Sequence, residues 1–120
     1  MGKLTIGSFT SLIGSMSLDF AVKLAESAVN KGYKVDFWVS GNATMLGKKN
    51  QSKFRDYSYL AKTVQDLIAT GNFRFCICEV CAKARGIHKE DAMEGVLIHS
   101  MDWYLASCFD ADRVLHIGGE

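Results

Sequence analysis

The sequence predicts an α/β protein, a single-domain three-layer sandwich built on a five-stranded parallel sheet. Two observations carry this prediction. Segments rich in apolar and β-branched residues alternate with segments of helical periodicity along all 120 residues. The composition, 48% hydrophobic and 22% charged, is that of a globular protein with a core of its own, and no repeat or linker interrupts residues 1–120. Such alternation favours parallel strands joined by right-handed crossovers, with helices on both faces of the sheet.

The first third of the chain predicts two strands around one helix. Residues 3–8 are apolar or β-branched enough for a short strand, and residues 9–15 form a loop rich in Ser and Gly. Ser17 is predicted to cap a helix, because apolar residues then recur at helical spacing until Gly32 ends the pattern. Residues 34–39 read as the second strand.

The middle of the chain predicts a long loop, a helix and a buried strand. Residues 40–56 are mostly polar and contain two glycines, which indicates a loop that is functional or mobile. A helix follows, with Leu60, Val64 and Leu67 on one face, and Gly71 ends it. Residues 73–78 are continuously apolar apart from one arginine, as in a strand buried on both faces.

The last third predicts shorter elements. Residues 79–84 are expected to form a short helix that stops before Gly86, and residues 89–93 a single helical turn. The remaining predicted elements are a fourth strand at 95–99, a helix at 101–109 and a final strand at 113–117. In sheets of this class, ligands and reactive groups gather beyond the carboxyl ends of the strands.

Charge and hydropathy exclude several classes of function. A net charge of +1 leaves no basic field for nucleic acid. No apolar run approaches the length of a membrane span, and the first residues lack the apolar stretch of a secretory signal. We therefore expect a cytoplasmic protein, whose thiols are kept reduced.

Three of the four cysteines, Cys76, Cys78 and Cys81, fall within six residues, and Cys108 lies far along the chain. In a reduced compartment such clustering is more typical of catalysis or metal binding than of a disulfide framework. Cys78 is the best candidate nucleophile, because it lies where a buried strand ends and a helix begins. Amide groups at a helix start favour thiolate over thiol, so the position predicts a lowered pKa for Cys78.

The residues around Cys78 suggest supporting roles. Cys81 follows one helical turn later and is a candidate resolving thiol. Arg85 either extends the positive environment or caps the short helix. His99, near the end of the fourth strand, is placed to move protons near neutral pH. Cys76 and Cys108 are expected to pack in the core, as free cysteines usually do.

Residues 77–87, Ile-Cys-Glu-Val-Cys-Ala-Lys-Ala-Arg-Gly-Ile, resemble the active-site segment of the DsrE/DsrF family of sulfur-relay proteins, especially its YchN-like branch. The resemblance implies a flavodoxin-like (DsrE-like) fold and assembly into homotrimers or homohexamers. It further implies that Cys78 takes up sulfane sulfur as a persulfide, as in a sulfurtransferase. The sulfur would pass to a carrier protein with a reactive cysteine (TusA- or DsrC-like). No cofactor or metal is implied.

Other readings of the residues stay open. Cys78-x-x-Cys81 also fits a thiol–disulfide redox protein, although a chain without proline cannot supply the cis-proline of thioredoxins. A non-enzymatic oligomeric regulator is a further alternative. A four-cysteine metal or iron–sulfur site is disfavoured, because Cys76 is a strand residue too far back to share one ion with the other two.

Nucleotide binding is disfavoured as well, because the glycines after the first strand match neither dinucleotide nor P-loop spacing. Ser8, Thr10, Ser11 and Ser15 would line an anion pocket beside Cys78 if the first and third strands were neighbours.

Overall fold

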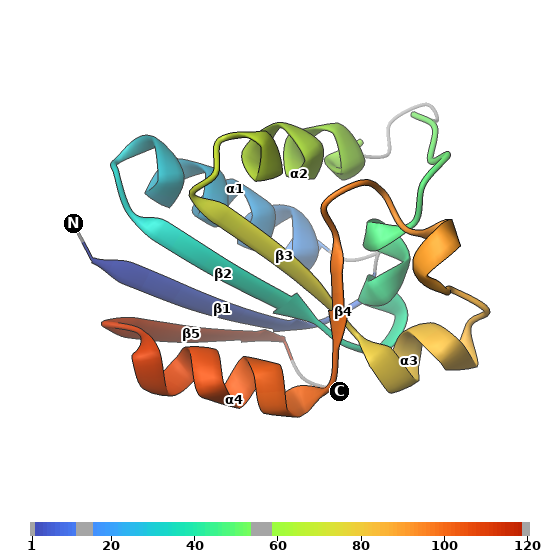
Figure 1. Ribbon diagram of the computed structural model, residues 1–120. Helices are drawn as coiled ribbons and strands as arrows, with labels where there is room; N and C mark the ends of the chain where they lie inside the picture. The colour runs from blue at the N-terminus through green and yellow to red at the C-terminus, as the bar shows by residue number, and fades with distance from the viewer. Residues whose placement is uncertain (1, 12–15, 54–58, 119–120) are drawn as a thin grey trace.

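The computed structural model describes residues 2–11, 16–53 and 59–118. The strands of the described chain are β1 (Lys3–Phe9), β2 (Lys34–Val39), β3 (Phe73–Cys78), β4 (Leu97–His99) and β5 (Arg113–Gly118). They form one sheet in which every neighbouring pair is parallel (Figure 1). The helices are α1 (Met16–Asn30), α2 (Leu60–Ala69), α3 (Glu79–Ala84) and α4 (Met101–Asp110), with 3-10 helices η1 (Gly41–Gly47) and η2 (Lys89–Asp91). The predicted α/β class and five-stranded parallel sheet are confirmed.

The strand order is β4-β3-β2-β1-β5. The chain therefore steps in one direction from β1 to β4 and then crosses back to place β5 on the far side of β1. Because parallel crossovers are right-handed, this reversal places α4 on the opposite face from α1 and α2, as Figure 1 shows. β2 separates β1 from β3, so these strands are not neighbours and the condition for an anion pocket of the β1-loop serines beside Cys78 is not met. Of those serines, Ser15 lies outside the described residues.

The face of the sheet covered by α1 and α2 holds the main hydrophobic core. Alternate residues of the central strands point into it, among them Ile6, Phe37 and Phe75, all fully buried. Leu18 and Val64 cover them from the two helices. Ala82 of α3 belongs to the same core, so α3 continues this layer at the carboxyl end of the sheet.

The opposite face is covered by α4. Trp38, Cys76, Cys78 and Tyr104 form a second buried cluster there. Tyr104 packs so closely on β1 that a Cβ on Gly7 would clash with the Tyr104 ring and hydroxyl group, so only glycine fits at this position.

Two expectations about local structure need correction. Residues 40–56 are not simply a polar loop, because η1 occupies their first half and buries Ala43, Thr44 and Leu46 against the core. Ser17 lies within α1 (Met16–Asn30) and therefore does not precede the helix as a cap. No helix of the described residues is both long and apolar enough to cross a membrane.

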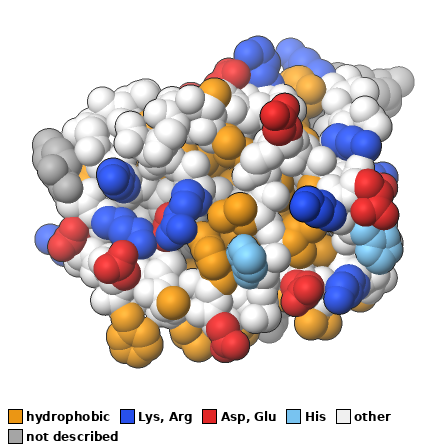
Figure 2. Space-filling view, viewed as in Figure 1, with side chains coloured by type: hydrophobic (Ala, Val, Ile, Leu, Met, Phe, Trp, Pro, Cys, Tyr) orange, Lys and Arg blue, Asp and Glu red, His pale blue; other side chains and the backbone are white. Residues whose placement is uncertain are grey.

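The solvent-facing side of α4 is unusually apolar. Met101, Leu105 and Phe109 recur every four residues and are 51%, 46% and 92% exposed. In Figure 2, hydrophobic side chains accordingly gather along the lower edge of the molecule, where Figure 1 places α4. The apolar residues of α4 thus extend well beyond those that the sheet buries.

Candidate thiol site

Cys78 lies at the junction that the sequence predicts. It is the last residue of β3 and the residue from which α3 starts, with extended backbone (φ −61°, ψ 124°). Its side chain is 9% exposed and lies in the cluster under α4 with Trp38 and Tyr104. The nucleophile candidate therefore stands at the carboxyl edge of the sheet, in largely apolar surroundings.

The electrostatics of Cys78 differ from the expectation. Burial is the largest influence and raises the pKa of the Cys78 thiol above its ordinary value. Backbone N–H groups of Cys81 and Val80 donate to the sulfur and act in the opposite direction, but they do not outweigh desolvation. The predicted lowering of the pKa is therefore wrong, although the amide groups that motivated it are where the strand-to-helix junction places them.

The Cys81 thiol contacts the Cys78 thiol through a side-chain hydrogen bond, which further raises the pKa of Cys78. Cys81 is half-buried and thus more open to solvent than Cys78. The sequence spacing of one helical turn correctly predicts that the two thiols meet. Because the two thiols are already in contact, they can form a disulfide without a rearrangement of β3 against α3.

Cys76 is fully buried, two residues before Cys78 on the same face of β3. Burial raises its pKa to about 12, so it stays a protonated packing residue, as predicted. Cys108, also expected in the core, is only half-buried at the margin of the same cluster. Its place beside Tyr104 on α4, at the edge of this cluster, was not predicted.

Tyr104 links Cys108 to the cluster. Burial, followed by a hydrogen bond with Cys108, raises the pKa of the Tyr104 hydroxyl to about 12. Its ring stacks on Trp38 with centroids 5.1 Å apart. Among the described residues, no three His, Cys, Asp or Glu side chains converge as ligands for one metal ion.

Arg85 joins the end of α3 to η1. Its guanidinium donates to the Cys81 carbonyl oxygen at 2.9 Å and to Asn42 Oδ1 of η1 at 2.9 Å. Of the two readings open from the sequence, these contacts favour the cap of the short helix. They also tie α3 to η1 and so hold the segment that carries Cys81.

His99 is the register partner of Cys78 in the β3–β4 pair. Residues paired directly across neighbouring strands point to the same face of a sheet, so the His99 imidazole lies on the same side as the Cys78 thiol. The His99 ring stacks on Trp103 with centroids 6.2 Å apart and planes 9° apart. Trp38 Nε1 donates to the His99 carbonyl oxygen at 3.3 Å, which fastens β4 to the aromatic cluster.

A charged cluster under α4 escaped the sequence reasoning. Asp36 is buried at the amino half of the same face and accepts hydrogen bonds from Arg74 Nε at 2.7 Å and Ser107 Oγ at 2.6 Å, with Lys3 Nζ 2.9 Å away. The Arg74 guanidinium also lies 5.0 Å from the centre of the Trp103 ring. The available signal was the alternation in residues 34–39, which places Asp36 on the face of Trp38.

Comparison with known proteins identifies the family of this chain. The family model described as the DsrE/DsrF-like family matches residues 7–117, a range that includes Cys78, Cys81 and His99.

The chain belongs to the DsrE/DsrF-like family.

Proteins of this DsrE/DsrF-like family generally work in sulfur relay. Two archaeal relatives carry no functional description. "Uncharacterized protein MJ0989" of Methanocaldococcus jannaschii is 30% identical over 97 residues, 79% of this chain and 82% of that protein. "Uncharacterized protein MK0008" of Methanopyrus kandleri is 28% identical over 95 residues, 79% of this chain and 77% of that protein.

Solved structures share the DsrE/DsrF-like fold over almost the whole chain. The crystal structure of the YchN protein from E. coli superposes with a TM-score of 0.85 at 22% identity, covering 97% of this chain and 99% of that one. The protein of unknown function MTH1491 from Methanobacterium thermoautotrophicum superposes with a TM-score of 0.76 at 12% identity, with the same coverage. These similarities confirm the expected fold.

Proposed function

We propose that this protein carries sulfane sulfur as a persulfide on Cys78 and passes it to a thiol of a partner protein. The observation that carries the proposal is the environment of the Cys78 sulfur, which accepts hydrogen bonds from the amides of Val80 and Cys81 and contacts the Cys81 thiol. Donors aimed at one sulfur stabilise the negative charge that develops on it during sulfur exchange. Membership of a sulfur-relay family supports the same assignment.

The uptake step needs no external oxidant or reductant. The Cys78 thiolate attacks the terminal sulfur of a donor R–S–SH, the donor S–S bond breaks, and R–S⁻ leaves with the bonding pair. Cys78–S–SH remains on the protein. Because the pKa of Cys78 is raised, its proton must first leave, and the imidazole of His99 beside it in register is the proposed acceptor.

The release step regenerates the resting protein. A thiolate of the partner attacks the outer sulfur of Cys78–S–SH, so that the partner leaves as a persulfide and Cys78 returns as a thiolate. The proposed partner is a cytoplasmic sulfur-carrier protein with a reactive cysteine. The proposed assembly is a homotrimer or homohexamer, and the exposed apolar stripe of α4 supports self-association.

The contact between the two thiols favours a second candidate function. If the Cys81 thiolate attacks the inner sulfur of Cys78–S–SH, HS⁻ leaves and a Cys78–Cys81 disulfide forms. The protein would then act as a thiol–disulfide redox protein. Arg85 has a positioning role in both candidates, because it holds the backbone of Cys81.

Intact-mass spectrometry after incubation with sodium polysulfide tests the proposal. We expect a reversible gain of about 32 Da, one sulfur atom, in the Cys81→Ser variant. The Cys78→Ser variant should show no such gain in mass. Cys76→Ser is the matched control, since it removes a buried thiol of the same cluster and should load sulfur normally. Uptake that persists in Cys78→Ser, or that never occurs, contradicts the proposal.

The wild-type protein separates the two candidate functions. A stable added sulfur that moves to a second thiol protein supports the carrier function. A loss of about 2 Da with release of sulfide, absent in Cys81→Ser, supports the redox function.

A further inference from the structure

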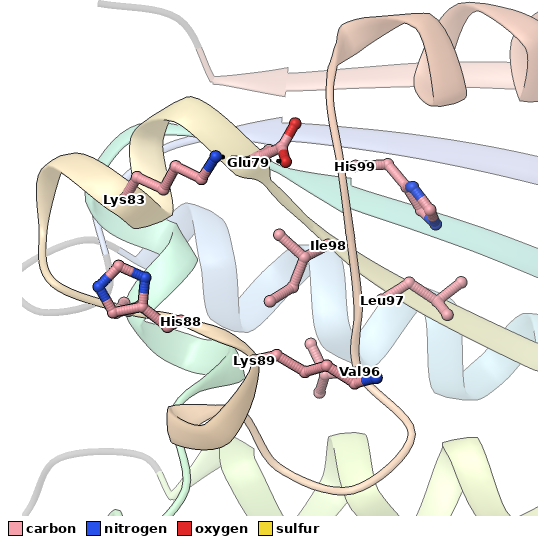
Figure 3. Close-up of a pocket in the computed structure, with 9 residues that line it drawn as sticks. Glu79, Lys83, His88, Lys89, Val96, Leu97, Ile98 and His99 are labelled. Carbon is pink, nitrogen blue, oxygen red and sulfur yellow. Dashed lines mark ion pairs between the residues drawn. The ribbon is translucent and has the colours of Figure 1, made fainter.

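A groove runs along the outer side of β4, between this strand, α3 and the turn that carries His88 and Lys89 (Figure 3). Its volume is about 450 Å³, large enough for several side chains. Ile87, Val96 and Ile98 supply apolar surface. Lys83, His88 and Lys89 stand around it, as Figure 3 shows.

β4 is an edge strand. It is outermost in the sheet order, and no strand of the described chain lies beyond it. A strand in this position presents backbone N–H and C=O groups that can pair with another extended chain. An open edge beside a groove with apolar surface is the arrangement that proteins use to bind peptides by strand addition.

We propose that this groove binds an extended acidic segment of the sulfur-accepting partner, which joins the sheet as a sixth strand beside β4. The inference rests on the proposed function, because it assigns a docking site to the partner of Cys78. In a bound strand, alternate side chains would point to opposite faces of the extended sheet. Apolar residues would enter the groove over Ile98 and Val96, and acidic residues would meet its basic rim.

The charges of the groove favour an acidic partner. Two lysines, Lys83 and Lys89, line it against one carboxylate, Glu79. Glu79 neutralises Lys83 only loosely, since the Nζ–Oε2 distance is 3.6 Å and both side chains are substantially exposed. Two imidazoles, those of His88 and His99, add further donors. An acidic strand therefore finds a net positive charge among the lining residues.

The same charges argue against a second copy of this chain as the occupant. The free strands that a second copy offers are β4 and β5, the two edges of the sheet. Their sequences, Leu-Ile-His and Arg-Val-Leu-His-Ile-Gly, contain no carboxylate and would bring further basic groups to a basic rim. Like charges across an interface disfavour pairing.

The position of the groove suits delivery to the thiol. β4 ends at His99, directly opposite Cys78 in register. Neighbouring strands lie roughly 4.8 Å apart, so a sixth strand would run about 10 Å from β3. A cysteine a few residues beyond the bound strand can turn over His99 and reach the outer sulfur of the Cys78 persulfide.

Synthetic peptides test the inference on the full-length protein. The probe is acetyl-Glu-Val-Asp-Val-Glu-Ser-amide, with a control peptide in which lysine replaces every acidic residue. We expect the acidic peptide to shift the amide signals of Leu97, Ile98 and His99, and to slow hydrogen exchange at the β4 amide that points away from β3. The lysine peptide should do neither.

Charge reversal in the groove supplies the matched comparison. The double variant Lys83→Glu/Lys89→Glu should weaken binding of the acidic peptide about tenfold. Lys23→Glu/Lys62→Glu makes the same change on α1 and α2, including the loss of a comparable ion pair to Asp66, and should bind like wild type.

Three results would overturn the inference: signals that move elsewhere, equal binding of the two peptides, or equal binding by the two variants. Protection of the outward-pointing β4 amide without any peptide would overturn it too, because the edge would already be filled by another copy. Polysulfide loading of Cys78 is measured separately. If Cys78 takes up sulfur but the acidic peptide does not bind, the docking site is wrong and the proposed function stands. If the peptide binds but Cys78 takes up no sulfur, the proposed function is wrong and the groove is a peptide-binding site only.

Discussion

At the scale of single residues, the reactivity of Cys78 is a balance between backbone amides and burial. The strand-to-helix junction supplies the amides, and the aromatic cluster under α4 supplies the burial. Burial is the larger effect, so the free thiol is held protonated at neutral pH. A buried, protonated thiol is protected from nonspecific oxidation. It needs a base, or a sulfur donor bound beside it, before it reacts.

This balance predicts the pH dependence of Cys78 alkylation. A raised pKa means that thiolate appears only as the pH rises above the ordinary titration range of cysteine. The rate of Cys78 modification by iodoacetamide should therefore reach its midpoint at a higher pH than in the same protein unfolded in urea. Peptide mapping by mass spectrometry gives the rate at Cys78 alone.

Cys76 supplies an internal control for this measurement. Its pKa of about 12 and its complete burial should keep it unmodified throughout. A midpoint for Cys78 below that of the unfolded chain would show that the amides outweigh burial.

At the scale of elements, α4 is held to the sheet by a buried charge cluster as well as by aromatic packing. Asp36 stands at its centre, with Lys3 and Arg74 from neighbouring strands and Ser107 from α4. Thr5 adds a hydrogen bond to Ser107 at 2.7 Å. Because Tyr104 belongs to the same helix as Ser107, this cluster also helps to hold the wall of the thiol site in place.

The cluster predicts that stability falls in acid. Burial by itself would raise the pKa of Asp36, but hydrogen bonds from Arg74, Ser107 and Lys3 lower it below its ordinary value of 3.8. The stabilisation from ionised Asp36 is therefore fully present above pH 3.8 and is lost as the pH falls through the lowered folded-state value. Urea unfolding of Asp36→Asn should show a loss of about 3 kcal/mol at pH 7, because Lys3 and Arg74 lose their carboxylate.

Asp66→Asn is the control, since Asp66 forms an exposed ion pair with Lys62 at 3.0 Å. Such surface pairs contribute roughly 0.5 kcal/mol or less, so this variant should be close to wild type. The difference between Asp36→Asn and wild type should shrink in acid. A difference independent of pH would show that the charge of Asp36 contributes nothing.

At the scale of the whole molecule, the two faces of the sheet are covered unequally. α1 and α2 cover one face, whereas α4 covers only part of the other and exposes an apolar stripe of its own. β5 is also mostly exposed, with Val114 and Leu115 at 44% and 40%. An apolar surface of this kind is typical of proteins that assemble.

The proposed self-association therefore predicts the effect of placing charges on the apolar stripe of α4. The double variant Leu105→Lys/Phe109→Lys should shift the molar mass measured by light scattering to that of a smaller species, because two exposed apolar side chains become charged. Phe20→Lys changes an equally prominent side chain, 61% exposed, on α1 and should leave the mass unchanged. Dissociation by Phe20→Lys instead would place the interface on α1.

Much of the fold was predictable, because local patterns decide local structure. The bounds of β2, β3 and α3 agree with the predicted ranges residue for residue. η1 was missed because a short segment with Gly, Asn and Thr has the composition of a loop, and only its packing against β3 and α3 reveals Ala43 and Leu46 as core residues. For the same reason the strand order was not predicted, since it depends on contacts between distant segments.

The sequence by itself determined the parallel α/β sheet, the place of Cys78 at the end of β3 and the approach of Cys81. Each of these follows from hydrophobic periodicity and the geometry of one strand and one helix turn. Only the tertiary structure decided that the pKa of Cys78 is raised, that Cys108 lies at the margin of the aromatic cluster, that Asp36 anchors α4, and that a groove follows β4. Burial, charge pairing and strand order are properties of segments brought together from far apart in the chain, and no local pattern encodes them.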